Sequence, residues 1–252
     1  MRILDGVHLV GSGNTGLGIS NGYDCHVYLL DGGDEMAVID AGGGRETQRI
    51  LDNAKNDGID TQKISKVFLS HSHSDHAAGA KNMRGLLGAK ILAPAGETKI
   101  IETADEKALG LDVARGEGRF YPPDYVFPAC PIDVKLKHGD KFRVGEFTLK
   151  AISVPGHTLD TMCFYTEVED AYYGKRKVLF SSDVVFFRGL ISLLNCQGSS
   201  LSAYREGIKN LERLGIDALF PGHFAFCIGG GQAQIDIALA AFKEMSVPPS
   251  AF

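Results

Sequence analysis

Three histidines and an aspartate stand within six positions of the segment FLSHSHSDHAAGA, residues 68–80. His71 and His73 are two residues apart, so in an extended loop they point the same way and can share one cation. Asp75 and His76 lie beyond the next turn and can reach a second cation. Imidazole and carboxylate ligands suit zinc, iron, manganese or cobalt, and the residues alone do not choose among these metals.

Three more side chains of metal-binding type follow apolar runs further along the chain. His157 comes after ISVPG, Asp183 after KVLFSS, and His223 after DALFPG. A carboxylate has two oxygens, so Asp183 can bridge two metals while the two histidines complete the two sides. A closed structural zinc site normally has four ligands that are rich in cysteine. Seven candidates without cysteine indicate two metals with open positions.

The surrounding elements predict a layered α/β sandwich. Residues 25–30 and 35–40 form a predicted hairpin, and further strands are expected at 66–70, 132–137, 147–154, 161–168, 177–182 and 217–220. Helices are expected at 45–57, 77–87, 98–109, 201–215 and 233–245. This order places helices outside and two sheets inside. We expect one domain over residues 1–252, with the proline- and aromatic-rich segment 95–131 as an insertion.

The composition limits the binding partners and the cellular location that we expect. The net charge of −5 argues against nucleic acid as a partner, because phosphate binding favours a basic face; a local basic patch is the alternative. No apolar stretch is long enough to cross a membrane and no signal peptide is recognisable, so we expect no membrane partner and a cytoplasmic protein. The five cysteines are scattered and never form a CxxC pair, which indicates reduced and mostly buried thiols.

The combination of HSHSDH, PGHT, SSD and PGH, in this order, resembles the metallo-β-lactamase superfamily from about residue 7 to the last helix. The resemblance implies a four-layer αββα sandwich of two mixed β-sheets with helices on the outer faces. It also implies a ligand set of His71, His73 and His157 on the first metal, Asp75, His76 and His223 on the second, and Asp183 bridging.

Asp40, in the segment VIDAG, is similar to a strand-end aspartate of that superfamily, which is expected to hydrogen-bond the ligand loop. The alternative is an ordinary turn aspartate before Gly42.

This sequence differs from several branches of the superfamily, and these differences limit the activities that we expect. β-Lactamases carry cysteine or serine where this chain has Asp183, and lactonases often have a tyrosine where it has Phe186. Glyoxalase II enzymes continue with a long glutathione-binding region, whereas 29 residues follow His223. RNA-processing members insert a further domain, and persulfide dioxygenases carry a threonine- and arginine-rich segment that VVFFRGLIS does not resemble.

Two segments complete the expected surroundings of the site. GSGNTG, residues 11–16, satisfies GxGxxG, but a strand-like run follows it instead of the helix that a dinucleotide site needs. We therefore interpret it as a mobile loop near the metals. Arg188 is the best nearby candidate cation for a substrate carboxylate, and a surface salt bridge is the alternative role for it. Aromatic and aliphatic residues could wall an apolar pocket or instead form core or dimer contacts: Phe120, Tyr121, Tyr125, Phe127, Phe186, Phe187, Leu190 and Ile191.

These observations predict a hydrolase that uses two divalent transition metals, with zinc expected and iron or manganese as alternatives. Water activated by the two metals would attack a carboxylic ester, lactone or thioester with an apolar acyl part. Asp183 and Asp75 are the expected catalytic residues, and Asp75 could also pass a proton to the leaving group. A phosphodiesterase and an iron-dependent oxidoreductase, similar to persulfide dioxygenases, are the alternatives.

Overall fold

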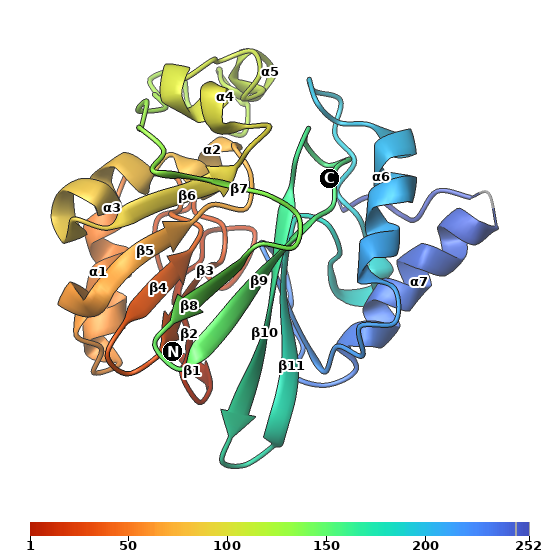
Figure 1. Ribbon diagram of the computed structural model, residues 1–252. Helices are drawn as coiled ribbons and strands as arrows, with labels where there is room; N and C mark the ends of the chain where they lie inside the picture. Colours follow the sequence, from red (N-terminus) through yellow and green to blue (C-terminus); the bar gives the residue numbers. More distant parts are fainter. Residues whose placement is uncertain (245, 252) are drawn as a thin grey trace.

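Two β-sheets lie face to face between outer helices in the computed structural model, which describes residues 1–244 and 246–251 (Figure 1). The predicted four-layer αββα architecture is therefore confirmed. Helices α1 (Thr47–Asn56) and α3 (Ala80–Leu87) lie on the outer side of one sheet, and α6 (Leu201–Gly207) and α7 (Gly231–Lys243) lie on the outer side of the other.

The first sheet has seven strands in sequence order. Its strands β1 to β4 pair antiparallel, and β4 to β7 pair parallel, so this sheet is mixed. The strands are β1 (Arg2–Leu4), β2 (Val7–Gly11), β3 (Val27–Asp31), β4 (Met36–Ile39), β5 (Ile64–Phe68), β6 (Lys90–Pro94) and β7 (Val134–Leu136).

The second sheet has five strands in the order β12-β11-β10-β9-β8. Only the β11–β12 pair is parallel, which makes this sheet mixed as well. The strands are β8 (Lys141–Val144), β9 (Phe147–Ser153), β10 (Met162–Asp170), β11 (Gly174–Ser182) and β12 (Ala218–Pro221).

Successive side chains of a strand point to opposite faces of its sheet, and both faces pack against other layers of the protein. In β3, Val27 and Leu29 pack toward the outer helices, whereas Tyr28 and Leu30 pack between the two sheets. The layer between the sheets also contains Phe164 and Phe180 from the second sheet and Phe68 from the first. A third cluster fills the space between the second sheet and its helices. Strands buried on both faces need apolar residues at nearly every position, which is the pattern that the sequence shows.

Two of the predicted helices end several residues earlier than expected. The helix expected at 98–109 is α4 (Thr98–Thr103), which ends where Ala104 adopts φ +50°. The chain becomes helical again only in α5 (Leu111–Ala114). The helix expected at 201–215 ends at Gly207 and continues as the 3-10 turn Ile208–Leu211. In the helix expected at 233–245, Met245 lies outside the described residues.

The segment 95–131 packs on the outer side of the first sheet, close to the upper end of the sandwich in Figure 1. Its buried side chains Tyr121, Tyr125 and Phe127 join the cluster that contains β5 and α1. Its identity as an insertion into a single domain stays a prediction.

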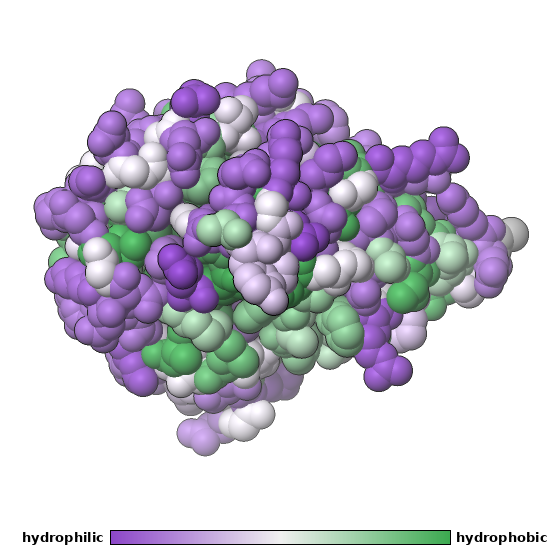
Figure 2. Space-filling model, turned by 90° about the horizontal axis from the view of Figure 1, so that it is seen from below, coloured by the Kyte–Doolittle hydropathy of each residue, from purple (hydrophilic) through white to green (hydrophobic). Residues whose placement is uncertain are grey.

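Figure 2 shows the lower end of the molecule, opposite α4 and α5. Hydrophilic side chains cover most of this face, and hydrophobic ones occupy smaller areas toward its middle and lower edge. In the described part of the chain, none of the helices is both long and apolar enough to cross a membrane.

Candidate metal centre

The seven predicted metal ligands follow four strands that end at the same edge of the sandwich. Residues 71–76 follow β5, His157 follows β9, Asp183 follows β11 and His223 follows β12. All seven side chains are buried and lie close together, although their roles as ligands remain a proposal. The cluster therefore includes residues from both sheets.

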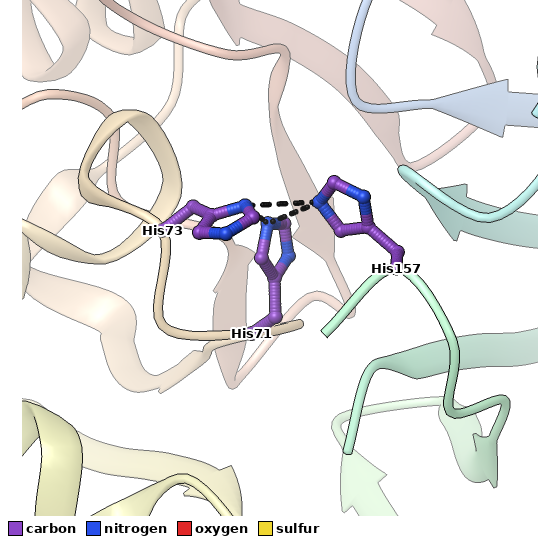
Figure 3. A group of neighbouring side chains, drawn as sticks. All are labelled: His71, His73 and His157. Carbon is purple, nitrogen blue, oxygen red and sulfur yellow. Dashed lines mark hydrogen bonds between the residues drawn. The ribbon is translucent and has the colours of Figure 1, made fainter. Parts of the chain in front are cut away.

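Three imidazoles converge on one point (Figure 3). His73 Nδ1 lies 3.1 Å from His71 Nε2 and 2.9 Å from His157 Nε2, and the last two nitrogens are 3.2 Å apart. His157 Nδ1 donates to the backbone oxygen of Ser192 at 2.9 Å, so its Nε2 carries a lone pair. The contacts drawn in Figure 3 cannot all be hydrogen bonds in one protonation state, because a neutral imidazole has only one N–H and His157 uses its own for Ser192. A shared cation would instead satisfy all three nitrogens.

A second group lies beside the first. His76 Nε2 and His223 Nε2 are 3.3 Å apart, and Asp75 Oδ2 is 3.1 Å from His223 Nε2. The other imidazole nitrogens have their own partners: His76 Nδ1 donates to Asp40 Oδ2 at 2.8 Å, and His223 Nδ1 lies 2.7 Å from Thr15 Oγ1. Both Nε2 atoms are thus oriented toward the same point as the carboxylate.

Asp183 contacts both groups. Its Oδ2 lies 3.6 Å from His157 Nε2 and 3.5 Å from His223 Nε2, and its Oδ1 lies 3.4 Å from His76 Nε2. Oδ1 is buried without a hydrogen-bond partner among the described residues. A buried carboxylate oxygen without a donor is costly, and a cation would remove that cost. The donor set and this oxygen therefore fit divalent metal ions.

The electrostatics of the cluster favour bound cations. Burial lowers the pKa of His73 to about 3, which keeps this imidazole neutral. Burial alone would raise the pKa of Asp183, but His223 and His76 hold it well below its usual range. Burial alone would lower the pKa of His76, but Cys25, Asp183 and other acidic neighbours raise it well above its usual value. The surroundings of His76 thus attract positive charge, which a metal ion can supply in place of the proton.

Asp40 holds the ligand loop, as the first of its two interpretations expected. It follows β4 with φ +62°, and its carboxylate accepts hydrogen bonds from the Ser70 backbone nitrogen at 2.7 Å and the Ser70 hydroxyl at 2.8 Å. The same carboxylate accepts from His76, so it fixes both the loop and one imidazole.

Sequence reasoning missed two supporting residues. Glu97 is fully buried and accepts hydrogen bonds from the backbone nitrogens of Ser72 at 2.5 Å and Asp160 at 3.0 Å, so it links the two histidine loops. It follows β6 and could have been found by the rule that located the ligands at strand ends. Tyr204, on helix α6, donates a hydrogen bond to the backbone oxygen of Asp183 at 3.1 Å. The sequence around Tyr204 contains no motif that would have indicated this contact.

An apolar cavity of about 310 Å³ opens onto the cluster. Of the proposed wall residues, Phe120 and Tyr121 line this cavity, whereas Tyr125, Phe127, Phe186 and Ile191 are core residues. Phe187, Arg188 and Leu190 do not line it. The described residues that line it are His73, Ser74, Asp75, Leu109, Gly110, Val113, Ala114, Phe120, Tyr121, Asp183, Ser192, Leu194, Asn195, Cys196 and His223.

One aromatic residue of the segment 95–131 contacts the metal-type side chains directly. The Tyr121 hydroxyl donates to Asp75 Oδ1 at 3.0 Å. A phenol therefore lies beside the cluster although Phe186 occupies the position where lactonases often have tyrosine. Thr15, which contacts His223, places the GSGNTG loop at the cluster as expected.

Comparisons with known proteins identify the family and agree with the fold. Residues 20–223 match the family model of the metallo-β-lactamase superfamily. The structure is similar to that of a subclass B3 metallo-β-lactamase of Bradyrhizobium japonicum, with a TM-score of 0.72 and 20% identity over 97% of this chain and 91% of that one. A metallo-β-lactamase of Elizabethkingia meningoseptica gives a TM-score of 0.70 and 20% identity over 88% and 76% of the two chains.

Two curated relatives carry names that describe thioester chemistry. An atrochrysone carboxyl ACP thioesterase of Aspergillus fumigatus is 26% identical over 79% of this chain and 50% of its own length. A hydroxyacylglutathione hydrolase of Bdellovibrio bacteriovorus is 23% identical over 81% of this chain and 62% of its own length. The chain thus spans about half to two thirds of these relatives.

The chain belongs to the metallo-β-lactamase superfamily, because the family model covers most of it. It is a homologue of metal-dependent hydrolases of that superfamily, whose members typically bind divalent metals.

Proposed function

We propose that this protein hydrolyses a thioester, carboxylic ester or lactone with an apolar acyl group, using two divalent metal ions, with zinc as the expected metal. One observation carries the proposal: an apolar cavity opens directly onto the ligand cluster, and His73, Asp75, Asp183 and His223 form part of its wall. The thioester names of two relatives support the choice of an acyl substrate.

The proposed ligand sets follow the two convergent groups of side chains. Two bound metals would polarise a carbonyl oxygen and lower the pKa of a water molecule toward about 7. The proposed sets are His71, His73 and His157 for one metal, Asp75, His76 and His223 for the other, and Asp183 for both.

The chain itself orients the substrate. Leu109, Val113 and Ala114 line the cavity wall and would bind the acyl chain, which leaves its carbonyl group beside Asp183 and His73. Such contacts exclude water and hold the reacting carbon in one place. Burial alone would raise the pKa of Asp75, but His76 and His223 hold it well below its usual range, so this carboxylate is an ionised acceptor. Its transfer of a proton to the leaving group stays a prediction.

The cavity lining disfavours phosphodiesters. Among the described residues, none of those that line the cavity is lysine or arginine. Phosphate groups are often bound by such cations in addition to metal ions, so the proposed metals would be the only counter-charge that the described lining offers to a phosphodiester. An iron-dependent oxidoreductase would be distinguished by its metal content and by turnover only in redox assays.

A substrate panel at constant zinc loading tests the proposal. It contains acyl thioesters of increasing chain length with one common thiol, matched esters and lactones, a phosphodiester and a β-lactam. We expect kcat/KM to rise about fourfold per added methylene until the cavity is filled, because each buried methylene contributes about 0.8 kcal/mol.

Ala114→Leu provides the matched variant, because Ala114 lines the cavity and is not a proposed ligand. The larger side chain should shift the optimum to a shorter acyl group while metal content stays the same. A preference for the phosphodiester, or no dependence on acyl length in either protein, would contradict the proposal.

A further inference from the structure

Tyr121 is held rigidly between the cavity and the candidate metal centre. Its side chain is 5% exposed. Its backbone nitrogen donates to the Ala114 oxygen at 2.8 Å, and its backbone oxygen accepts from Gly116 at 2.9 Å. These hydrogen bonds tie Tyr121 to the end of α5, so its ring enters the cavity wall from a fixed backbone.

Aromatic neighbours fix the ring as well. Tyr125 stacks on Tyr121 with ring centroids 4.3 Å apart and planes 26° from parallel. Tyr125 is itself anchored, because its hydroxyl donates to the Gly43 backbone oxygen at 2.7 Å. The ring of Tyr23 packs against Tyr121 at 5.8 Å. The Tyr121 phenol consequently has little freedom to leave its partner.

That partner is one oxygen of Asp75. The Tyr121 hydroxyl donates to Oδ1 at 3.0 Å, whereas the other oxygen, Oδ2, faces the imidazoles, 3.1 Å from His223 Nε2 and 3.7 Å from His76 Nε2. A carboxylate with two free oxygens can rotate or bind one cation through both. A donor on Oδ1 removes that freedom and leaves Oδ2 for the metal.

We infer that Tyr121 is a positioning residue, which holds Asp75 so that a single oxygen is presented to the metal beside His76 and His223. The inference rests on the ligand sets given under the proposed function. It also makes Tyr121 a direct connection between the acyl-binding wall and the metal centre. The same ring lines the cavity and orients a metal ligand, so the segment 95–131 contributes to metal binding although none of its residues is a proposed ligand.

The test measures zinc binding to metal-free protein by calorimetry and by competition with a chromophoric chelator. Tyr121→Phe keeps the ring and removes the donor. We expect the affinity for one zinc ion to fall about 10- to 100-fold, as is usual when a hydrogen bond to a metal ligand is lost, while the other ion binds as before. Tyr23→Phe, the control, removes a hydroxyl from the same aromatic cluster without removing the hydrogen bond to Asp75, and should bind both ions normally.

A double-mutant cycle separates positioning from a general structural effect. If Tyr121 acts through Asp75, then Tyr121→Phe should change zinc affinity little when Asp75→Ala, which removes the acceptor of the tyrosine hydroxyl, is already present. Equal affinity of wild type and Tyr121→Phe for both ions, or a full additional loss in the Asp75→Ala background, would overturn the inference. The measurement of zinc affinity needs no substrate. If it shows the expected loss for Tyr121→Phe while the acyl panel shows no activity, only the proposed function is overturned.

Discussion

At the scale of single residues, Asp183 is the side chain that lies beside both histidine groups. Its two oxygens lie within 3.6 Å of His157, His223 and His76, and one of them lacks any hydrogen-bond partner among the described residues. Asparagine has the same shape but no charge, so we expect Asp183→Asn to fold normally, to lose one of two zinc ions, and to lose at least about 100-fold in kcat.

Elemental analysis, circular dichroism and turnover on the best acyl substrate measure the effect of Asp183→Asn. Asp140→Asn is a suitable control, because Asp140 accepts a backbone hydrogen bond from Lys137 in the turn before β8. A folded Asp183→Asn protein with two zinc ions and normal turnover would remove Asp183 from the metal centre.

At the scale of elements, an ion pair anchors α3 to the edge of the first sheet. Arg84 on α3 donates to Asp133 at 2.5 and 3.1 Å, and the same carboxylate accepts from the Ile91 backbone nitrogen in β6 at 2.8 Å. We expect Asp133→Asn to lower the free energy of unfolding by about 1 kcal/mol, because the charge-assisted hydrogen bonds are lost at a partly exposed site.

The effect of Asp133→Asn should depend on pH. The hydrogen bond from Arg84 lowers the pKa of Asp133, so the folded state binds the proton less tightly than the unfolded state. The contribution of Asp133 to stability is therefore complete above the pKa that this carboxyl has in the unfolded state, about 4. It disappears as the pH falls through the lower pKa that the carboxyl has in the folded state. Urea denaturation of both proteins should show a larger difference in the free energy of unfolding at pH 7 than near pH 3; a difference that is the same at both pH values would contradict this expectation.

At the scale of the whole molecule, the candidate metal centre joins the two sheets. Residues 71–76 extend from β5 in the first sheet, and His157, Asp183 and His223 extend from strands of the second. The unfolded chain does not hold these residues together, so bound metals stabilise only the folded state. Free zinc at 100 times its Kd would contribute about 2.7 kcal/mol, which corresponds to a Tm increase of roughly 5 to 10 °C for a domain of this size.

Calorimetric melting of zinc-loaded protein with and without a chelator measures this stabilisation. Asp183→Asn should show a smaller change in Tm on chelation, because it binds less metal at the start. An unchanged Tm for the wild-type protein would show that the metals do not couple to the fold.

Local patterns in the sequence were enough to predict the two sheets and the seven clustered residues. Apolar runs ending in His71, Asp183 or His223 indicate buried strands followed by ligands, and strands that end at one edge bring such residues together. Helix ends were less accurate: α4 ends at Thr103, and the chain then turns through a left-handed Ala104. Such an end depends on packing with the rest of the fold, which periodicity does not contain.

The sequence by itself therefore determined the class of fold and the residues of the candidate metal centre, because the order of the elements and the position of each metal-type side chain after an apolar run can both be read along the chain. Only the tertiary structure decided which side chains support them. Tyr121 lies 46 positions from Asp75, and Glu97 lies 63 positions from Asp160. No local periodicity links residues so far apart; they meet because the segment 95–131 and the strand β6 pack beside the histidine loop. That packing also decided that Tyr121 lines the cavity, whereas Tyr125 and Phe127, which belong to the same buried cluster, do not.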